Sequence, residues 1–200
     1  MKIEINAISK KFNQHWIIKN FSYTFSASKK YAIVGANGSG KSTLLKMIAG
    51  MITADKGSIN YSKNEKPIAV DDFFSSIAIA APYLDLPENL SIEELLKTHI
   101  ILRPLSIDIP TLLNEVKIDK TKIIRELSSG MKQRLKLSLA IYSSAPILLL
   151  DEPTANFDDY WKNWYQQKIA SIAPNTLVIL CSNEKHEYEN FDAIVELKML

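Results

Sequence analysis

The segment that decides the fold is Tyr31–Ile48, "YAIVGANGSGKSTLLKMI", in which an apolar run leads into a glycine-rich turn and then into a helical pattern. A continuous apolar run such as "YAIV" is typical of a parallel strand that is covered on both faces. The glycines at 35, 38 and 40 allow the backbone to turn tightly with its amides facing outward. The segment therefore predicts a buried strand, a loop and a helix of about two turns that stops at Gly50.

The loop in this segment, "GANGSGKST", matches the phosphate-loop pattern of Gly, four residues, Gly, Lys and Ser or Thr. Its backbone amides and the positive end of the following helix are suited to bind a polyphosphate. Lys41 is expected to reach the β- and γ-phosphates, and the Ser42 hydroxyl is expected to bind Mg²⁺. A turn that was merely tight would not need a lysine followed by two hydroxyls. The expected nucleotide-binding residues here are Gly35, Ala36, Asn37, Gly38, Ser39, Gly40, Lys41, Ser42 and Thr43.

A second apolar strand, "ILLLDEP" at 147–153, supplies two carboxylates. Asp151 emerges at the carboxyl end of this strand, which is where ligands bind in open parallel sheets. Asp151 is the candidate partner of Mg²⁺, and it acts either through a bridging water or by contacting the groups that ligate the ion. Glu152 is the candidate base that polarises a water for attack on the γ-phosphate. A solvated Asp-Glu pair on the surface is the alternative, and the four aliphatic residues before the pair disfavour it.

The rest of the chain predicts an α/β fold with a mainly parallel sheet. Alternating residues in the first 30 positions predict antiparallel strands with one buried face. Between Leu90 and Ala145, three helical patterns separated by Pro104, Pro110 and polar turns predict an inserted helical subdomain. We therefore expect a single domain, 1–200, with a helical subdomain at about 83–145.

Composition and charge exclude several classes of protein. The 24 basic and 22 acidic residues are scattered and give a net charge of +2, so we expect no nucleic-acid partner. The single cysteine, Cys181, excludes an intramolecular disulfide, and we interpret it as a small buried hydrophobe. The N-terminal residues lack the apolar core of a signal peptide, and no stretch approaches the roughly 18 apolar residues of a membrane span. We expect a cytoplasmic protein that reaches a membrane only through a partner.

Two further motifs lie in an order that resembles ATP-binding cassette (ABC) ATPases over essentially the whole chain. Leu127–Arg134, "LSSGMKQR", is similar to the family signature L-S-G-G-Q, and "PTANFD" is similar to its D-loop, with Asp158 at the characteristic aspartate. Ser128, Ser129 and Gly130 lie at a helix start, where they suit either an anion or an ordinary N-cap. The resemblance implies that they close over ATP held by a second cassette, in a homodimer or in a pair with a related chain.

The resemblance implies an ATPase subunit that hydrolyses ATP to ADP and phosphate and powers solute transport through a separate transmembrane permease. Such a subunit is peripheral on the inner face of the cell membrane, and its permease contacts the region at 81–90, "APYLDLPENL". Adenine stacks on an aromatic side chain near the N-terminus in this family, and Phe12 occupies the matching place. A core position for Phe12 and a competing role for Trp16 stay open.

Two landmarks of the family are missing. The glutamine that follows the strand before the helical subdomain is replaced by Ala81 or Pro82, and the place of the switch histidine falls on Asn183, with His186 three residues further along. Asn183 can donate a hydrogen bond to the γ-phosphate but cannot carry charge. Losing one positioned donor typically lowers a rate by about 10²- to 10³-fold. The alternative function is therefore a nucleotide-gated dimerisation switch with weak or partner-dependent hydrolysis.

A third class, the cassette ATPases of DNA repair and translation, is disfavoured by the sequence. Those proteins usually carry long coiled-coil insertions or a second cassette, and neither is visible here. A simple phosphate-loop kinase is disfavoured by the signature and by Glu152. Met131 in place of the signature glutamine is a milder departure from the family.

Overall fold

The computed structural model describes residues 1–199, with only the backbone of residues 70 and 71, and it divides into two compact units. The α/β unit comprises Met1–Ile77, Ala145–Glu152 and the chain from Ala173 onward. The helical unit comprises Ala78–Ser144 and Pro153–Ile172. The second of these segments is not part of the range 83–145 expected from the sequence. The chain therefore enters the helical unit directly after Glu152.

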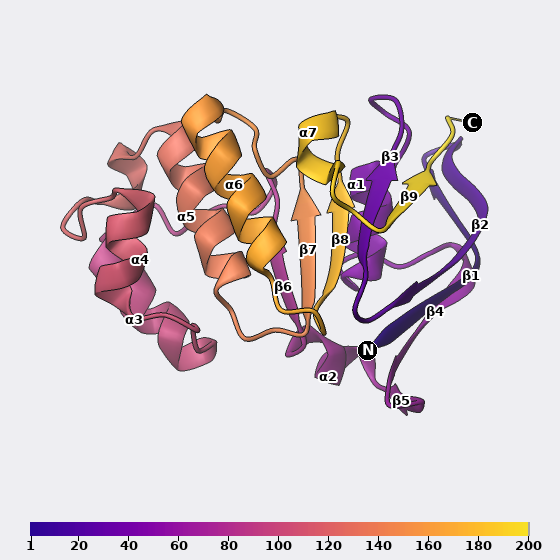
Figure 1. Cartoon of the computed structure of the whole chain (residues 1–200). Helices are drawn as coiled ribbons and strands as arrows, with labels where there is room; N and C mark the ends of the chain where they lie inside the picture. The colour runs from indigo at the N-terminus through magenta and orange to yellow at the C-terminus, as the bar shows by residue number, and fades with distance from the viewer. Residues whose placement is uncertain (200) are drawn as a thin grey trace. The chain divides into compact units, whose positions relative to one another are not determined.

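A parallel sheet forms the centre of the α/β unit (Figure 1). Strands β7 (Ile147–Asp151), β8 (Leu177–Cys181), β3 (Lys30–Val34) and β9 (Ala193–Glu196) are neighbours in that order, and their pairings are parallel. All residues of β7 and β8 are buried, as expected for strands covered on both faces. Helix α1 (Lys41–Ile48) lies against these two strands. The predicted α/β class with a parallel core is confirmed.

The register of the sheet makes its strands end together. Asp151 at the end of β7 is paired with Cys181 at the end of β8, and Cys181 is paired with Ile33 of β3. The residues that follow these strands therefore meet at one edge of the sheet, where the loop between β3 and α1 also begins. The short helix α7 (Lys185–Tyr188) follows β8 in the same unit.

The α/β unit also contains an antiparallel sheet, which confirms the prediction for the N-terminal strands. Its order is β2 (His15–Ser26), β1 (Lys2–Phe12), β4 (Lys56–Lys63) and β5 (Lys66–Ile68). The pairing of β1 with β2 is irregular between Ile5 and Lys11, so this part of β1 departs from strict alternation.

Two short elements connect the antiparallel sheet to the helical unit, namely α2 (Val70–Phe74) and β6 (Ile77–Ala80). Phe73 of α2 stacks on Tyr61 of β4 at 3.9 Å between ring centroids, and the Tyr61 hydroxyl donates to the carbonyl oxygen of Ile48 at 3.1 Å. Burial raises the pKa of Tyr61 to about 12. This buried ring therefore joins β4 to the end of α1.

The helical unit is built from α3 (Ile92–Leu102), α4 (Ile109–Val116), α5 (Ser129–Ile141) and α6 (Asp159–Ser171), with a 3₁₀ turn at Ile124–Glu126. Each of the four helices begins with a side-chain cap that accepts a backbone hydrogen bond three residues further on. The caps are Ser91, Asp108, Ser128 and Asp158.

Within residues 1–199, none of the helices combines the length and apolar character needed to cross a membrane. The apolar cluster of this unit includes Ile92, Leu96, Leu112, Val116, Ile124 and Leu135, all fully buried.

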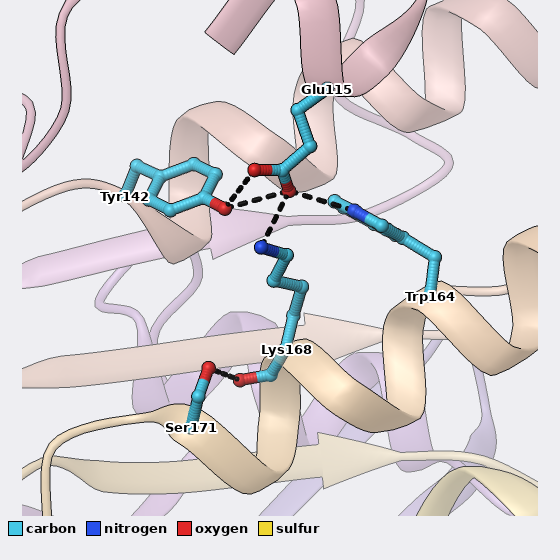
Figure 2. A network of polar contacts seen from close by, with 5 residues as sticks. All are labelled: Glu115, Tyr142, Trp164, Lys168 and Ser171. Carbon is cyan, nitrogen blue, oxygen red and sulfur yellow. Dashed lines mark hydrogen bonds and ion pairs between the residues drawn. The ribbon is translucent and has the colours of Figure 1, made fainter. Parts of the chain in front are cut away.

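One carboxylate, that of Glu115, joins α4 to the end of α5 and to α6 (Figure 2). Its oxygens accept hydrogen bonds from the hydroxyl of Tyr142 at 2.6 Å, from Nε1 of Trp164 at 2.7 Å and from Nζ of Lys168 at 2.9 Å. Burial alone would raise the pKa of Glu115, but the three donors outweigh it and hold the pKa below its ordinary value. The helices therefore share one satisfied, half-buried anion.

We predict that Glu115→Ala lowers the free energy of unfolding by about 1–3 kcal/mol, because it leaves the donors of Trp164 and Lys168 without their acceptor. Glu93→Ala on α3 is the matched control, since its pairing with Lys97 at 3.0 Å lies on the surface, where solvent screens such pairs and they contribute little to stability. Chemical denaturation of both variants measures the difference. Equal losses for the two variants would show that the Glu115 network contributes nothing specific.

Candidate functional site

The loop between β3 and α1 has the tight geometry that the sequence predicts. A Cβ atom added at Gly35 would lie 2.3 Å from the carbonyl oxygen of Leu197, so only glycine fits where the chain leaves β3. Gly40, directly before α1, has a φ of 98°, which is left-handed backbone that glycine adopts without strain. Together these two residues present the free N–H groups at the start of α1 to the loop.

Lys41 lies across this loop. Its side chain is buried, and its Nζ donates to the carbonyl oxygens of Gly35 at 2.7 Å and Ala36 at 3.2 Å. The N–H of Ser39 donates to the same Ala36 oxygen at 3.1 Å and closes the turn. The ammonium group is therefore held at the centre of the loop, where a phosphate bound by the backbone amides would meet it.

Asp151 carries a buried carboxylate at the end of β7. It is 2% exposed, and neither oxygen makes a hydrogen bond of good geometry within the described chain. Burial raises the pKa of Asp151, and the nearby Ser42 hydroxyl opposes this rise. A buried carboxylate without a full set of partners is costly, so a bound cation would relieve the site.

The residues at this point fit a magnesium ion. A carboxylate and a hydroxyl are oxygen ligands of the kind that Mg²⁺ prefers, and Mg²⁺ usually completes its shell with water and substrate phosphates. Among the side chains that the structure describes, no group of three or more from His, Cys, Asp and Glu is placed to hold a metal by itself. Ser42 and Asp151 therefore suit an ion that arrives with a nucleotide, as the sequence predicts.

Glu152 turns away from the core that holds its neighbour. Its φ of 44° is unusual for a residue other than glycine, and its N–H donates to the carbonyl oxygen of Cys181 at 2.9 Å. Such strained backbone persists where the surroundings fix it, and it clusters at functional sites. The exposed Glu152 side chain lines a cavity of about 360 Å³ together with the phosphate loop. The residues lining this cavity are Phe12, Ile17, Asn37, Gly38, Gly40, Lys41, Ser42, Thr43 and Glu152.

Phe12, the candidate for adenine stacking, lies at the end of β1 and at the wall of this cavity. Its side chain is 49% exposed, so it is not a core residue. Trp16 is not among the described residues that line the cavity, and its ring faces the ammonium groups of Lys11 and Lys56, each 5.7 Å from its centroid. The geometry thus favours Phe12 over Trp16 as the aromatic surface next to the phosphate loop.

Asn183, which follows β8, contacts the phosphate loop directly. Its Nδ2 donates to Oδ1 of Asn37 at 2.6 Å. His186 lies on α7, and its Nδ1 is 3.7 Å from the carboxylate of Glu184. Of the two candidates in this stretch, the structure brings Asn183 to the site.

The signature and D-loop residues lie in the helical unit. Ser128 and Ser129 are exposed at the start of α5, where the Ser128 hydroxyl accepts from the N–H of Met131 at 3.2 Å. A Cβ atom at Gly130 would lie 3.2 Å from the carbonyl oxygen of Asn156, so the signature glycine lies close to the D-loop. Asp158 caps α6 through the N–H of Trp161 at 3.0 Å. Ser128 and Asp158 thus each cap a helix. The roles expected of the signature and D-loop residues at the nucleotide of a second cassette stay predictions.

Two residues have roles that sequence reasoning did not assign. Gln133 is buried on α5, and its Nε2 donates to the carbonyl oxygen of Pro153 at 3.0 Å, which ties the signature helix to the segment after the acidic pair. The available signal was a polar residue at a buried helical position. Cys181 is fully buried as expected, and its thiol also donates to the carbonyl oxygen of Lys41 at 3.4 Å. Burial raises the pKa of this thiol well above its ordinary value.

Comparison with known proteins gives consistent matches. The family model described as "ABC transporter" matches residues 18–155. The lantibiotic transport ATP-binding protein SrtF of Streptococcus pyogenes is 30% identical over 185 residues, which cover 90% of this chain and 79% of that protein. The Nod factor export ATP-binding protein I of Rhizobium johnstonii is 28% identical over 185 residues and 89% of this chain. This chain spans only about 60% of the length of that relative.

A solved structure matches the whole described fold. The putative ABC transporter ATP-binding protein from Pyrococcus furiosus has a TM-score of 0.80 with this chain at 26% sequence identity. The match covers 98% of each chain. The two units described above are therefore both represented in a protein of nearly the same extent.

We predict that Asp151→Asn stabilises the protein in the absence of divalent cations. The folded-state pKa of Asp151 is raised above its ordinary value of 3.8, so its contribution to stability is present at low pH and is lost as the pH rises through the folded-state pKa. Unfolding by denaturant with EDTA, at a series of pH values from 3.8 upward, should show the variant gaining on the unmodified protein.

Asp55→Asn is the control of opposite sign. The pKa of Asp55 is lowered, mainly by the N–H of Lys11 and the side chain of Lys10, so its stabilisation is present above its unfolded pKa and is lost as the pH falls. This variant should lose ground as the pH rises. If both variants changed in the same direction, the unpaired burial of Asp151 would not be the cause.

Proposed function

The chain belongs to the ABC transporter family, and we propose that it is the subunit that binds and hydrolyses ATP to power solute transport through a separate permease. The observation that carries the proposal is the cavity in which Glu152 meets the phosphate loop and Phe12. The names of the relatives support it, since they describe ATP-binding proteins of lantibiotic transport and of Nod factor export.

ATP binding follows from the residues of the α/β unit. The loop amides and Lys41 bind the β- and γ-phosphates, and the ammonium group exchanges its contacts with the loop carbonyls for phosphate oxygens. Phe12 offers an exposed aromatic face for the adenine. Ser42 and Asp151 would hold Mg²⁺, which would supply charge neutralisation at the phosphates.

Hydrolysis requires a base and a donor near the γ-phosphate. Glu152 orients a water and accepts its proton as the water oxygen bonds to the γ-phosphorus. The bond from that phosphorus to the β–γ bridging oxygen then breaks, which gives ADP and phosphate. Asn183 donates a hydrogen bond to the γ-phosphate during this step. Lys41 stabilises the negative charge that develops on the phosphate oxygens.

The remaining candidate residues act on a second subunit in this proposal. Ser128, Ser129 and Gly130 lie at an exposed helix start, which suits contact with the ATP of another cassette. Asp158 is exposed at the start of α6, in the same helical unit. The two cassettes form a homodimer or a dimer of this chain with a related one, and the dimer contacts no nucleic acid.

The permease places the subunit at the inner face of the cell membrane in this proposal. The segment 81–90 is the proposed contact, and Tyr83 and Leu84 lie within it. Ala81 at the start of the segment is fully buried, and its carbonyl oxygen accepts from Nζ of Lys136 at 3.1 Å. This contact joins the segment to the signature helix α5. The helix thereby links the proposed permease contact to the signature residues at its start.

A second candidate function is a nucleotide-gated dimerisation switch with little turnover. A specific observation favours it: Ala81 or Pro82 stands where the family has a glutamine, and Asn183 stands where it has a histidine. Neither an alanine nor a proline side chain can hydrogen-bond a water, and a carboxamide cannot accept a proton. In this function ATP closes the dimer, and hydrolysis is slow or depends on the partner.

We predict that Glu152→Gln abolishes Mg²⁺-dependent hydrolysis and traps an ATP-bound dimer. The carboxamide keeps the size of the side chain but cannot accept the proton of the attacking water. Phosphate release measures the first effect, and size-exclusion chromatography with ATP measures the second. Glu65→Gln, in an exposed turn between β4 and β5, is the matched control and should retain turnover.

The dimerisation-switch function predicts a different result for the unmodified protein. If it binds ATP and dimerises but shows no turnover even with its permease, the enzyme proposal is wrong and the switch proposal stands.

We also predict that Asn183→Ala slows turnover by about 10²- to 10³-fold, as expected for loss of one positioned donor. His186→Ala should slow it less, because Asn183 donates to Asn37 of the phosphate loop, whereas His186 lies on α7 near the carboxylate of Glu184. Steady-state kinetics of the two variants gives the ranking. The reverse ranking would place the γ-phosphate contact at His186.

A further inference from the structure

An asparagine that donates to a phosphate must be held the right way round. Its side chain ends in an NH₂ group and a carbonyl oxygen that are nearly equal in size but opposite in hydrogen-bonding character. Turned one way, the group donates to a γ-phosphate, and turned the other way, its oxygen repels the same phosphate. A protein that uses Asn183 in this place therefore needs a neighbour that selects the orientation.

Asn37 is such a neighbour. Its Oδ1 accepts from Nδ2 of Asn183 at 2.6 Å, although the two residues are 146 positions apart. Rotating the Asn183 carboxamide alone by half a turn would bring two carbonyl oxygens together, so the contact couples the orientation of Asn183 to that of Asn37. The NH₂ group has two N–H bonds, and this contact uses one of them. The other is available to a ligand.

Both sides of the contact are fixed by the backbone. Ser182, directly before Asn183, is fully buried, its N–H donates to the carbonyl oxygen of Ile33 at 3.2 Å, and its hydroxyl accepts from the N–H of Glu184 at 2.9 Å. Asn37 lies inside the turn that the N–H of Ser39 closes. The two side chains therefore meet because the end of β8 and the phosphate loop are both held in place.

The position of the pair relates it to the nucleotide. Asn37 lines the cavity that also contains Lys41 and Glu152. Asn183 is not among the described lining residues and reaches the cavity through Asn37. Asn37 and Asn183 are both exposed residues, so a phosphate can approach them without displacing core side chains.

We propose that Asn37 is a positioning residue, which orients the carboxamide of Asn183 so that its NH₂ group faces the γ-phosphate. The inference rests on the proposed binding of ATP at this loop. It adds to that function a role for the Asn37 side chain, beyond the backbone contacts that a phosphate loop makes. The two amides together take the place of one histidine.

The test compares binding of a non-hydrolysable imido analogue of ATP with binding of ADP, both with Mg²⁺, by the full chain. Asn37→Ala should weaken the analogue about three- to tenfold relative to ADP, which is the effect expected for losing one hydrogen bond. In the Asn183→Ala background, the same substitution should cause no further change in that ratio. The kcat of hydrolysis should follow the same pattern.

Asn60→Ala, an exposed asparagine on β4, is the matched control and should leave the ratio unchanged. An equal loss in both backgrounds would show that Asn37 acts independently of Asn183. A gain in analogue affinity would show that Asn37 sequesters the donor instead, and it would also overturn the proposal. If the chain binds the analogue but never hydrolyses ATP, the proposed enzyme activity fails while the affinity ratio still decides the role of Asn37.

Discussion

The arrangement of the site depends on the close approach of Gly35 to the carbonyl oxygen of Leu197. Any side chain at this position would collide with the backbone that follows β9. Because the chain passes there without a Cβ atom, it turns directly from the buried strand β3 into the loop, and Gly40 then admits the left-handed backbone before α1. The amides of the loop, the start of the helix and Lys41 are thereby brought to the edge at which β7 and β8 also end.

The same edge carries a cost in stability. Asp151 is buried with no well-formed hydrogen bond, and burial raises its pKa, while the adjacent Glu152 is held in strained backbone and points into the cavity. Neither feature improves the packing of the α/β unit. Both are explained if the carboxylates serve a bound ligand, since a cation satisfies the first and a water near a phosphate engages the second. The buried strands β7 and β8 stabilise the unit and offset this cost.

The sequence alone predicts much of this site, because its motifs are local. The strand, loop and helix around Lys41 follow from consecutive residues, and the place of Asp151 follows from the aliphatic run before it. Contacts between distant segments could not be predicted in the same way. The exposure of Phe12 depends on how β1 pairs, the membership of α6 in the helical unit depends on its packing, and the half-buried Glu115 network joins α4 and α6 to the end of α5. Periodicity identifies such helices but not which of their polar side chains meet.

The contact between Asn37 and Asn183 changes the meaning of the missing histidine. A histidine at this place would change charge near neutral pH, and its contact with a phosphate would strengthen as it became protonated. A carboxamide has no such transition, so its hydrogen bond is the same on both sides of neutrality. Because the carboxamide carries no charge, its contact with a phosphate depends on its orientation. An acceptor on the phosphate loop provides that orientation at the point where the ligand binds. In the proposed function, the loss of an ionisable group is thus partly offset by a second amide, so the contact with the γ-phosphate depends on geometry rather than on protonation.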